Sequence, residues 1–244
     1  MEQGRKQIAG VEAIAAALER GDPVRVLLVD REDQSTATRA LVDAARARGA
    51  RVWLGGAGDL RRLTRGSSPA VALAMVGPDP RCDLPGLLAR GGAVWLLHRA
   101  RYASNVGFAL RTAEVSGADG VVVDGNFNHE QRGRIGHVSM GADEILPLLF
   151  ETTERTLELA RRAGHRLIAL EDTGDLPPWQ VDLRGPVVLL VGNERLGIEP
   201  SVLARCDAVT ALPMPGFVPS YNLQAALSAV ALERLRQIER DYSK

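Results

Sequence analysis

The stretch RYASNVGFALRTAEVSGADGVVVDG, residues 101–125, decides the fold of the second half of the chain. Its apolar spacing predicts a helix over about 104–116, followed by the strand GVVVDG. The start of that helix carries Asn105 and Gly107, and Arg111 follows one turn after the glycine. Helix formation needs none of these three residues, which raises the question of what they do.

The whole chain alternates helices and strands, a pattern typical of an α/β protein with a mostly parallel sheet. The expected strands cover 24–30, 51–56, 70–77, 93–100, 120–125, 166–172, 186–194 and 208–214. The expected helices cover 10–21, 37–50, 104–116, 154–165 and 222–242. Between them GPDPRCDLPG, residues 77–86, holds three prolines in ten residues and suits neither a central strand nor a helix interior. We therefore expect two domains, 1–80 and 88–244.

The composition excludes several classes of protein. Thirty acidic and thirty basic residues balance, so an RNA surface would have to be a local patch. Lysine occurs only at Lys6 and Lys244, and this arginine bias fits either phosphate binding or a GC-rich coding sequence. Cys82 and Cys206 stand alone, which argues against a disulfide framework and a zinc site. Without a signal peptide or a membrane-spanning run, we expect a cytoplasmic protein with no metal.

Three turns with glycines and polar residues follow predicted strands: RARYASNVG, GNERLG and PMPGFVPSYN. Ligands bind at the carboxyl edge of open α/β sheets, so together the turns make a site plausible, although each alone can be a simple turn. At the first turn, Ser104 can cap the helix and Gly107 permits close backbone approach. The start of this helix, with Arg111 one turn further on, could bind an anion. A capped helix with a solvated arginine that binds nothing is supported equally well.

The other two turns offer similar choices. Glu194 lies between Gly192 and Gly197 directly after an apolar strand, where a loop could take a flat ligand and present the carboxylate to it. An exposed loop is the alternative. Ser220 and Asn222 precede the closing helix, where both residue types also serve as caps.

Taken together, the motifs resemble the SpoU/TrmH branch of the SPOUT methyltransferases. Three motifs occur in the family's order: Asn105-x-Gly-x-x-x-Arg111-x-Ala113, then Gly192-Asn193-Glu194 with Gly197, then Leu212-Pro213-Met214 leading to Ser220-x-Asn222. HVSMGA, from His137, is similar to a weaker element between the first two motifs. The first half resembles, through AGVEAIAAALERG and its order of elements, a ribosomal-protein-like domain that binds the RNA substrate in many members.

The resemblance implies a function and a fold that periodicity does not show. Members transfer a methyl group from S-adenosylmethionine to a ribose 2′-hydroxyl of ribosomal or transfer RNA. Their C-terminal domain forms a deep trefoil knot that holds the cofactor, and they are homodimers with sites near the subunit interface. By position, the catalytic and site-lining residues are Arg111, Asn105, Glu194, Ser220 and Asn222. The cofactor-binding residues are Gly192, Asn193, Leu212, Met214 and Tyr221.

Methyl transfer needs an aligned hydroxyl and stabilisation of the developing oxyanion. Because arginine stays protonated, we expect Arg111 to hold the RNA phosphate and stabilise the alkoxide, with Asn105 orienting it. Tyr221 departs from the usual Ser-Leu-Asn-Val-Ser sequence, and Arg195 adds bulk where small residues are common.

The sequence allows two alternative functions. The protein could be a catalytically silent RNA-binding protein, or a knotted enzyme that methylates a non-RNA acceptor. A dinucleotide oxidoreductase is a poor match, because no G-x-G-x-x-G follows a first strand. The closing helix carries an apolar stripe that either packs in the core of the chain or forms the dimer interface. Its residues are Leu223, Ala226, Leu227, Val230 and Ala231.

Overall fold

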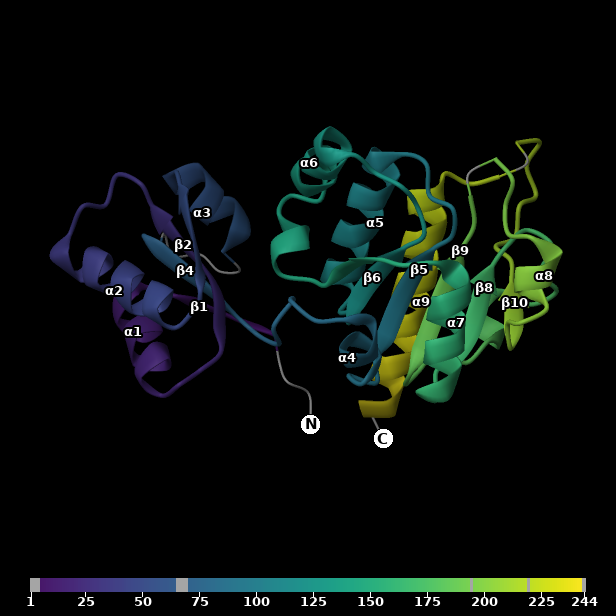
Figure 1. Cartoon of the computed structure of the whole chain (residues 1–244), viewed down its shortest axis with the longest axis horizontal. Coiled ribbons are helices and arrows are strands. Elements are labelled where there is room, and N and C mark those ends of the chain that lie inside the picture. The colour runs from purple at the N-terminus through teal and green to yellow at the C-terminus, as the bar shows by residue number, and fades with distance from the viewer. Residues whose placement is uncertain (1–4, 65–69, 194, 219, 243–244) are drawn as a thin grey trace. The chain divides into compact units, whose positions relative to one another are not determined.

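The computed structural model describes residues 5–64, 70–193, 195–218 and 220–242 (Figure 1). The chain divides into two compact units, Met1–Pro80 and Arg81–Lys244. The division falls inside the proline-rich segment 77–86, where a short helix, α4 (Leu84–Leu88), begins with Pro85 in its first turn. Proline is tolerated there because the first helical N–H groups have no partner within the helix.

The N-terminal unit is a four-stranded sheet in the order β1-β4-β2-β3. Its strands are β1 (Lys6–Ala9), β2 (Val24–Asp30), β3 (Arg51–Gly55) and β4 (Ala72–Val76), and its helices are α1 (Val11–Glu19), α2 (Thr36–Ala47) and α3 (Ala57–Leu63). Strands β2 and β3 run parallel, whereas β4 runs antiparallel to both β1 and β2. The prediction of a mostly parallel sheet is therefore wrong for this unit, because alternation of helices and strands does not fix strand direction.

The C-terminal unit is a six-stranded parallel sheet in the order β10-β8-β9-β5-β6-β7 (Figure 1). Its strands are β5 (Ala93–Leu97), β6 (Gly120–Val123), β7 (Leu148–Phe150), β8 (Arg166–Leu170), β9 (Val187–Val191) and β10 (Ala208–Thr210). Its longer helices are α5 (Ala103–Val115), α6 (His129–Val138), α7 (Thr153–Arg162) and α9 (Leu223–Tyr242), and α8 (Pro200–Leu203) is short. This confirms the predicted α/β class.

Strand β5 shows why the central strands are apolar throughout. Trp95 and Leu97 face the core built with α5 and α9, while Val94 and Leu96 face the core built with α4 and α7. Successive side chains of a strand point to opposite faces, so a strand covered on both sides reads as a continuous apolar run.

Helix α6 did not stand out in the sequence because it contains Gly133 and Gly136, which disfavour helix. It forms nevertheless, because Asn128 and Gln131 make a capping box at its start and because it packs against α5. A Cβ on Gly107 of α5 would lie 2.7 Å from Cβ of Val138 in α6. The close approach that Gly107 permits is therefore that of the neighbouring helix.

The stripe on α9 packs mainly inside the chain. Leu227, Val230 and Ala231 are buried in the core beside α5, and Leu223 packs against it. The core alternative is correct for these residues. Within the ranges that the structure describes, no helix is long and apolar enough to cross a membrane.

Candidate functional site

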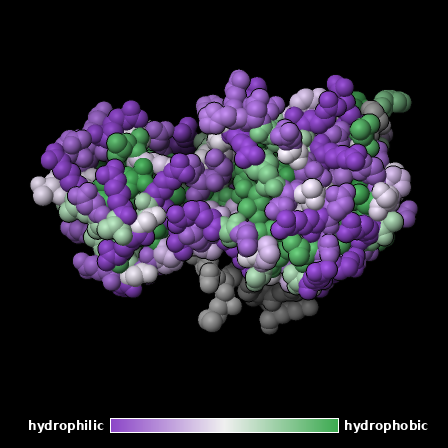
Figure 2. Space-filling model, in the orientation of Figure 1, coloured by the Kyte–Doolittle hydropathy of each residue, from purple (hydrophilic) through white to green (hydrophobic). Residues whose placement is uncertain are grey.

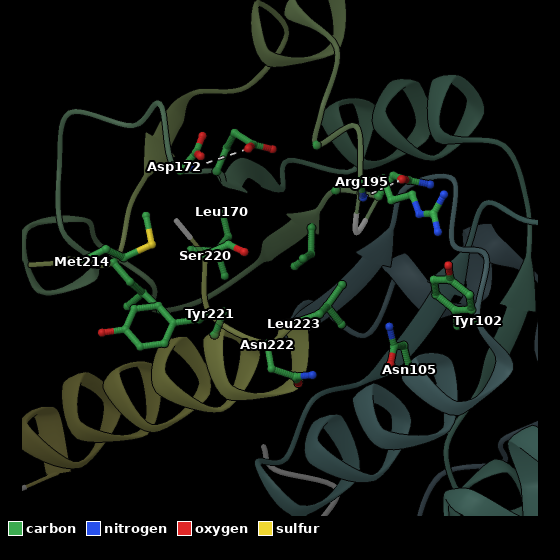
Figure 3. A pocket seen from close by; sticks show the side chains of 17 residues that line it. Tyr102, Asn105, Leu170, Asp172, Arg195, Met214, Ser220, Tyr221, Asn222 and Leu223 are labelled. Carbon is green, nitrogen blue, oxygen red and sulfur yellow. Dashed lines mark hydrogen bonds between the residues drawn. The ribbon is translucent and has the colours of Figure 1, made fainter. Parts of the chain in front are cut away.

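A pocket of about 510 Å³ opens at the carboxyl edge of the parallel sheet (Figure 3). The segments that line it follow β5, β8, β9 and β10, and the start of α9 completes it. The lining residues are Tyr102, Asn105, Leu170, Glu171, Asp172, Val191, Gly192, Asn193, Arg195, Gly197, Leu212, Met214, Ser220, Tyr221, Asn222, Leu223 and Ala226. Strands β5 and β9 lie side by side where the strand order changes direction, the usual place for ligand sites in open α/β sheets.

Most of the residues predicted for the site line this one pocket. They are Asn105, Gly192, Asn193, Leu212, Met214, Ser220, Tyr221 and Asn222. Glu194 lies outside the described residues. Arg111 is exposed and is not part of the pocket lining. It follows Asn105 by six residues, which is about 9 Å along the helix axis and about 120° around it.

The start of α5 supplies Tyr102 and Asn105 to the pocket. Tyr102 is the N-cap, and no side chain caps the helix. The expectation that Ser104 caps it is therefore wrong: the helix begins at Ala103, and Ser104 lies within its first turn. Figure 3 shows Tyr102 and Asn105 near Arg195, with Met214 and Asp172 at the other end of the pocket.

The loop after β9 is held by Asn193, which is buried. Its side-chain Nδ2 donates to the carbonyl of Arg99 at 2.8 Å, and its Oδ1 accepts from the backbone N–H groups of Arg195 and Leu196 at 2.9 and 3.2 Å. A Cβ on Gly192 would lie 2.6 Å from the carbonyl carbon of Gly197, so the glycine lets the loop close on itself. Gly192 therefore has a structural role in the loop, beside any contact with a ligand.

Glu171, which follows β8, is a site residue that the sequence patterns missed. Its Oε2 accepts from the N–H of Ile198 at 2.8 Å, so this carboxylate holds the far end of the β9 loop. Burial raises the pKa of the Glu171 carboxyl, although hydrogen bonds from Ile198 and Asp172 oppose the shift. The only available signal was a pair of acidic residues, Glu171 and Asp172, at the end of an apolar strand.

The third turn joins the pocket to α9. Asn222 Oδ1 accepts from the N–H of Gln224 at 2.9 Å, so Asn222 caps the helix as well as lining the pocket. The hydroxyl of Tyr221 donates to the carbonyl of Pro213 at 3.0 Å, and this hydrogen bond connects the two ends of the turn. Ser220 is exposed and lines the pocket.

The lining can bind a ligand that is partly flat and partly charged. Leu170, Leu212 and Met214 offer apolar contact, and the loops offer backbone donors and acceptors. Two carboxylates, Glu171 and Asp172, can attract a positively charged group. Among the described residues, no group of three or more His, Cys, Asp or Glu side chains is placed to hold a metal ion.

The sequence profile of the SpoU rRNA Methylase family matches residues 93–232. The 23S rRNA (guanosine-2′-O-)-methyltransferase RlmB of Photorhabdus laumondii is 30% identical over 240 residues, covering 94% of this chain and 97% of that protein. RlmB of Pseudomonas aeruginosa is 34% identical over 134 residues, 54% of each chain.

Solved structures are similar over nearly the whole chain. The SpoU methyltransferase AviRb from Streptomyces viridochromogenes, in complex with the cofactor AdoMet, is 27% identical with a TM-score of 0.58, covering 97% of this chain and 91% of that one. The AdoMet-bound rRNA methyltransferase from Sinorhizobium meliloti shares the fold, with a TM-score of 0.62, 23% identity, and coverage of 96% and 88%.

Proposed function

Because the chain belongs to the SpoU rRNA methylase family, we propose that it transfers a methyl group from S-adenosylmethionine to a ribose 2′-hydroxyl of 23S ribosomal RNA. The family predicted from the three motifs is confirmed by the match over residues 93–232. The observation that carries the proposal is the pocket, where the three motifs meet at the carboxyl edge of the sheet.

The pocket suits S-adenosylmethionine in size and in chemistry. A volume of about 510 Å³ lies within the usual range for small-molecule sites. Leu212 and Met214 would give an apolar surface for the adenine ring, and the backbone at Gly192 and Tyr221 would offer it hydrogen-bonding groups. The bound cofactor supplies an electrophilic methyl group on a sulfonium. We propose that the chain crosses here in the knot expected for the family.

The residues of the first and third motifs act on the acceptor. Asn105 and Asn222 orient polar groups of the ribose by hydrogen bonds, since an amide both donates and accepts. Arg111 would hold the RNA phosphate beside the reacting ribose and stabilise the negative charge on the 2′-oxygen as its proton passes to solvent water. Ser220 lines the same pocket, and we propose from the family motif that Glu194 also serves this reaction.

We propose a homodimer, and the position of Arg111 supports it. Phe108, Arg111 and Val115 follow helical spacing on one exposed face of α5, where 37% of Phe108 and 66% of Val115 are accessible. Helix α9 packs against α5 and exposes 66% of Leu232. A second subunit on this face would cover the apolar side chains and would bring Arg111 into a shared site, since it does not line the pocket of its own chain.

Basic side chains near α5 suit the RNA backbone. Arg132 and Arg134 are exposed on α6, and Figure 2 shows a hydrophilic surface over this helix. Guanidinium groups pair with phosphate oxygens, and phosphate contacts position a protein on RNA without reading its sequence. We propose that the N-terminal unit also binds the RNA substrate and that the enzyme acts in the cytoplasm, where ribosomal RNA and the cofactor occur.

Guanosine is the acceptor that the RlmB relatives support. The second candidate is uridine, because the 23S rRNA (uridine(2479)-2′-O)-methyltransferase of Streptomyces viridochromogenes is 28% identical over 96% of this chain and 83% of that protein. Transfer of a methyl group to the ribose 2′-hydroxyl would use the same site for either base.

The proposal is tested by methyl transfer from labelled S-adenosylmethionine to purified RNAs. We expect label in 23S ribosomal RNA and little in small-subunit ribosomal RNA or transfer RNA. Label in a protein or small molecule instead of RNA would favour the non-RNA acceptor. RNA binding without incorporation, at saturating cofactor, would favour a catalytically silent RNA-binding protein.

A further inference from the structure

The loop after β9 places Arg195 on a short turn that the main chain closes. The backbone N–H of Asn193 donates to the carbonyl of Gly197 at 3.2 Å, and the N–H of Gly197 donates to the carbonyl of Asn193 at 2.9 Å. Oδ1 of Asn193 also accepts from the N–H of Arg195 at 2.9 Å. Only the main chain of Arg195 takes part in these bonds, so the turn does not depend on its side chain.

The side chain of Arg195 brings an unpaired positive charge to the pocket. Arg195 is exposed and belongs to the pocket lining. Within the described ranges, its guanidinium group forms no ion pair and no hydrogen bond. The guanidinium of Arg99 differs, because it pairs with Glu199. A guanidinium presents its N–H donors in a planar fork that matches the oxygens of a phosphate or a carboxylate, so Arg195 can bind an anion.

Tyr102 offers a second donor at the same end of the pocket. Its side chain makes no hydrogen bond to α5, although Tyr102 is the N-cap of that helix, and 43% of the residue is exposed. In the part of the chain that the structure describes, the phenol hydroxyl has no hydrogen-bond partner. Figure 3 shows this hydroxyl and the guanidinium of Arg195 pointing toward one another from two walls of the pocket. Both groups are hydrogen-bond donors, so they can hold one anion between them.

The two ends of the pocket differ in charge. Figure 3 shows Asp172 and Met214 at the end opposite Arg195. The carboxylate of Asp172 repels negative charge, so an anionic part of a ligand should lie at the Arg195 end. Asn105 lines the pocket at this same end, and it is the residue proposed to orient the ribose of the acceptor. A ribose within an RNA chain is joined to one phosphate on its 5′ side and another on its 3′ side. A ribose held by Asn105 therefore brings a phosphate to this end.

We propose that Arg195 and Tyr102 form a phosphate subsite, in which both side chains donate to one phosphate next to the ribose that receives the methyl group. The inference rests on the proposed function for the identity of the acceptor. It adds to the role proposed for Arg111, which is not part of this pocket lining, because the ribose has two neighbouring phosphates and each arginine can hold one. Phosphate contacts carry no sequence information, so the subsite fixes where the ribose lies and not which base is chosen.

The carboxylate on the methionine part of the cofactor is the other anion that this fork could hold. The exposure of both side chains favours the phosphate, because a group on a polymer has to reach them from outside the pocket. S-adenosylhomocysteine carries the same carboxylate as the cofactor and no phosphate. Its affinity therefore distinguishes the two anions.

The salt dependence of RNA binding tests the subsite directly. The probe is an unmodified 23S ribosomal RNA transcript, and its affinity is measured by filter retention at several KCl concentrations. One phosphate contact contributes about 0.7–0.9 to the steepness of log affinity against log salt concentration. Arg195→Ala should lose about that much steepness and about tenfold or more in affinity at low salt. Arg195→Lys should keep the steepness, since the charge remains, and should lose part of the affinity, since an ammonium has no fork.

Two further variants separate the hydroxyl and the bulk charge from the arginine fork. Tyr102→Phe keeps the ring and the charge, so RNA binding should weaken about threefold to tenfold with unchanged steepness. In an Arg195→Ala background the same change should cost less, because the shared phosphate is no longer held. The control Arg162→Ala removes an exposed arginine of α7, which pairs with Glu158 and does not line the pocket. It should bind RNA as the wild type does.

The possible failures are distinct. Arg195→Ala with wild-type steepness and affinity would overturn the inference, as would a loss no larger than that of Arg162→Ala. Calorimetric titration should show unchanged affinity of Arg195→Ala for S-adenosylhomocysteine. A loss there, with RNA binding intact, would assign Arg195 to the cofactor carboxylate and also overturn the inference. A wild type that binds the transcript and transfers no methyl group would contradict the proposed function, while the salt dependence would still decide whether Arg195 contacts a phosphate.

Discussion

Replacing Gly197 with alanine should damage the pocket in two separable ways. Gly197 has φ 64°, in the left-handed region, so any side chain there is strained. A Cβ would also lie 2.8 Å from Oε2 of Glu171, the oxygen that accepts from the N–H of Ile198. The substitution therefore pushes the carboxylate away from its partner, in addition to straining the backbone.

The expected loss in the free energy of unfolding is the sum of these two effects. The left-handed backbone costs about 1–2 kcal/mol for a residue with a Cβ. Loss of a hydrogen bond to a charged group costs about 1.5–3 kcal/mol, and the partial exposure of Glu171 favours the lower end. Gly164→Ala is a matched control, because Gly164 has φ 80° and nothing within 4 Å of its Cβ position. The control should show the backbone cost alone.

Urea unfolding measures the free energy of unfolding of each variant. Gly197→Ala should lose about 1.5 kcal/mol or more beyond the loss in Gly164→Ala. A double-mutant cycle sharpens the test: in a Glu171→Ala background the carboxylate is gone, so Gly197→Ala should cost no more than Gly164→Ala. Titration with S-adenosylhomocysteine should show weaker binding by Gly197→Ala and unchanged binding by the control. Equal unfolding free energies for the two single variants would refute the role given to Glu171.

Three further results are expected. Burial lowers the pKa of His165 from its usual 6.5, so the unfolded chain binds a proton that the folded ring does not. The unfolding free energy should therefore fall as the pH drops below about 6.5, and His165→Leu should remove this slope in urea titrations at about pH 5.5 and 7.5; an unchanged slope would contradict the assignment. Leu232→Asp should yield a monomer by light scattering, whereas Leu54→Asp, with 63% of that leucine exposed on the N-terminal unit, should leave the mass unchanged; a dimeric Leu232→Asp would place the interface elsewhere. Arg111→Ala should lower single-turnover methylation about 10²–10³-fold with cofactor affinity intact, and Arg111→Lys should restore little. A near wild-type rate would remove Arg111 from the reaction.

Much of the C-terminal fold could be predicted because its strands are buried on both faces. Each strand reads as an apolar run, and β5 and β9 were recognisable for that reason. Helix α6 could not be predicted in the same way. Gly133 and Gly136 disfavour a helix, and the contact with Gly107 that stabilises α6 joins residues far apart in the sequence. The direction of the strands in the N-terminal unit could not be predicted either, because side chains alternate in the same way along parallel and antiparallel strands.

The site was predictable where its residues belong to compact motifs. Asn105, Asn193 and Asn222 stand in short patterns, and the pocket brings them together. Glu171 stands apart from those motifs, and its partner Ile198 lies 27 residues away in the sequence. No local spacing predicts such a contact, so the role of Glu171 emerges only when the loops after β8 and β9 are seen at one edge of the sheet.

The proposed acceptor of the methyl group is a ribose 2′-hydroxyl of 23S ribosomal RNA. The most direct test is to methylate that RNA with the purified enzyme and digest it to nucleosides for mass spectrometry. We expect one new nucleoside whose added mass lies on the ribose, and a neighbouring phosphodiester that resists alkaline hydrolysis because the adjacent 2′-oxygen is blocked. A methyl group on the base, or no new nucleoside at saturating S-adenosylmethionine, would contradict it.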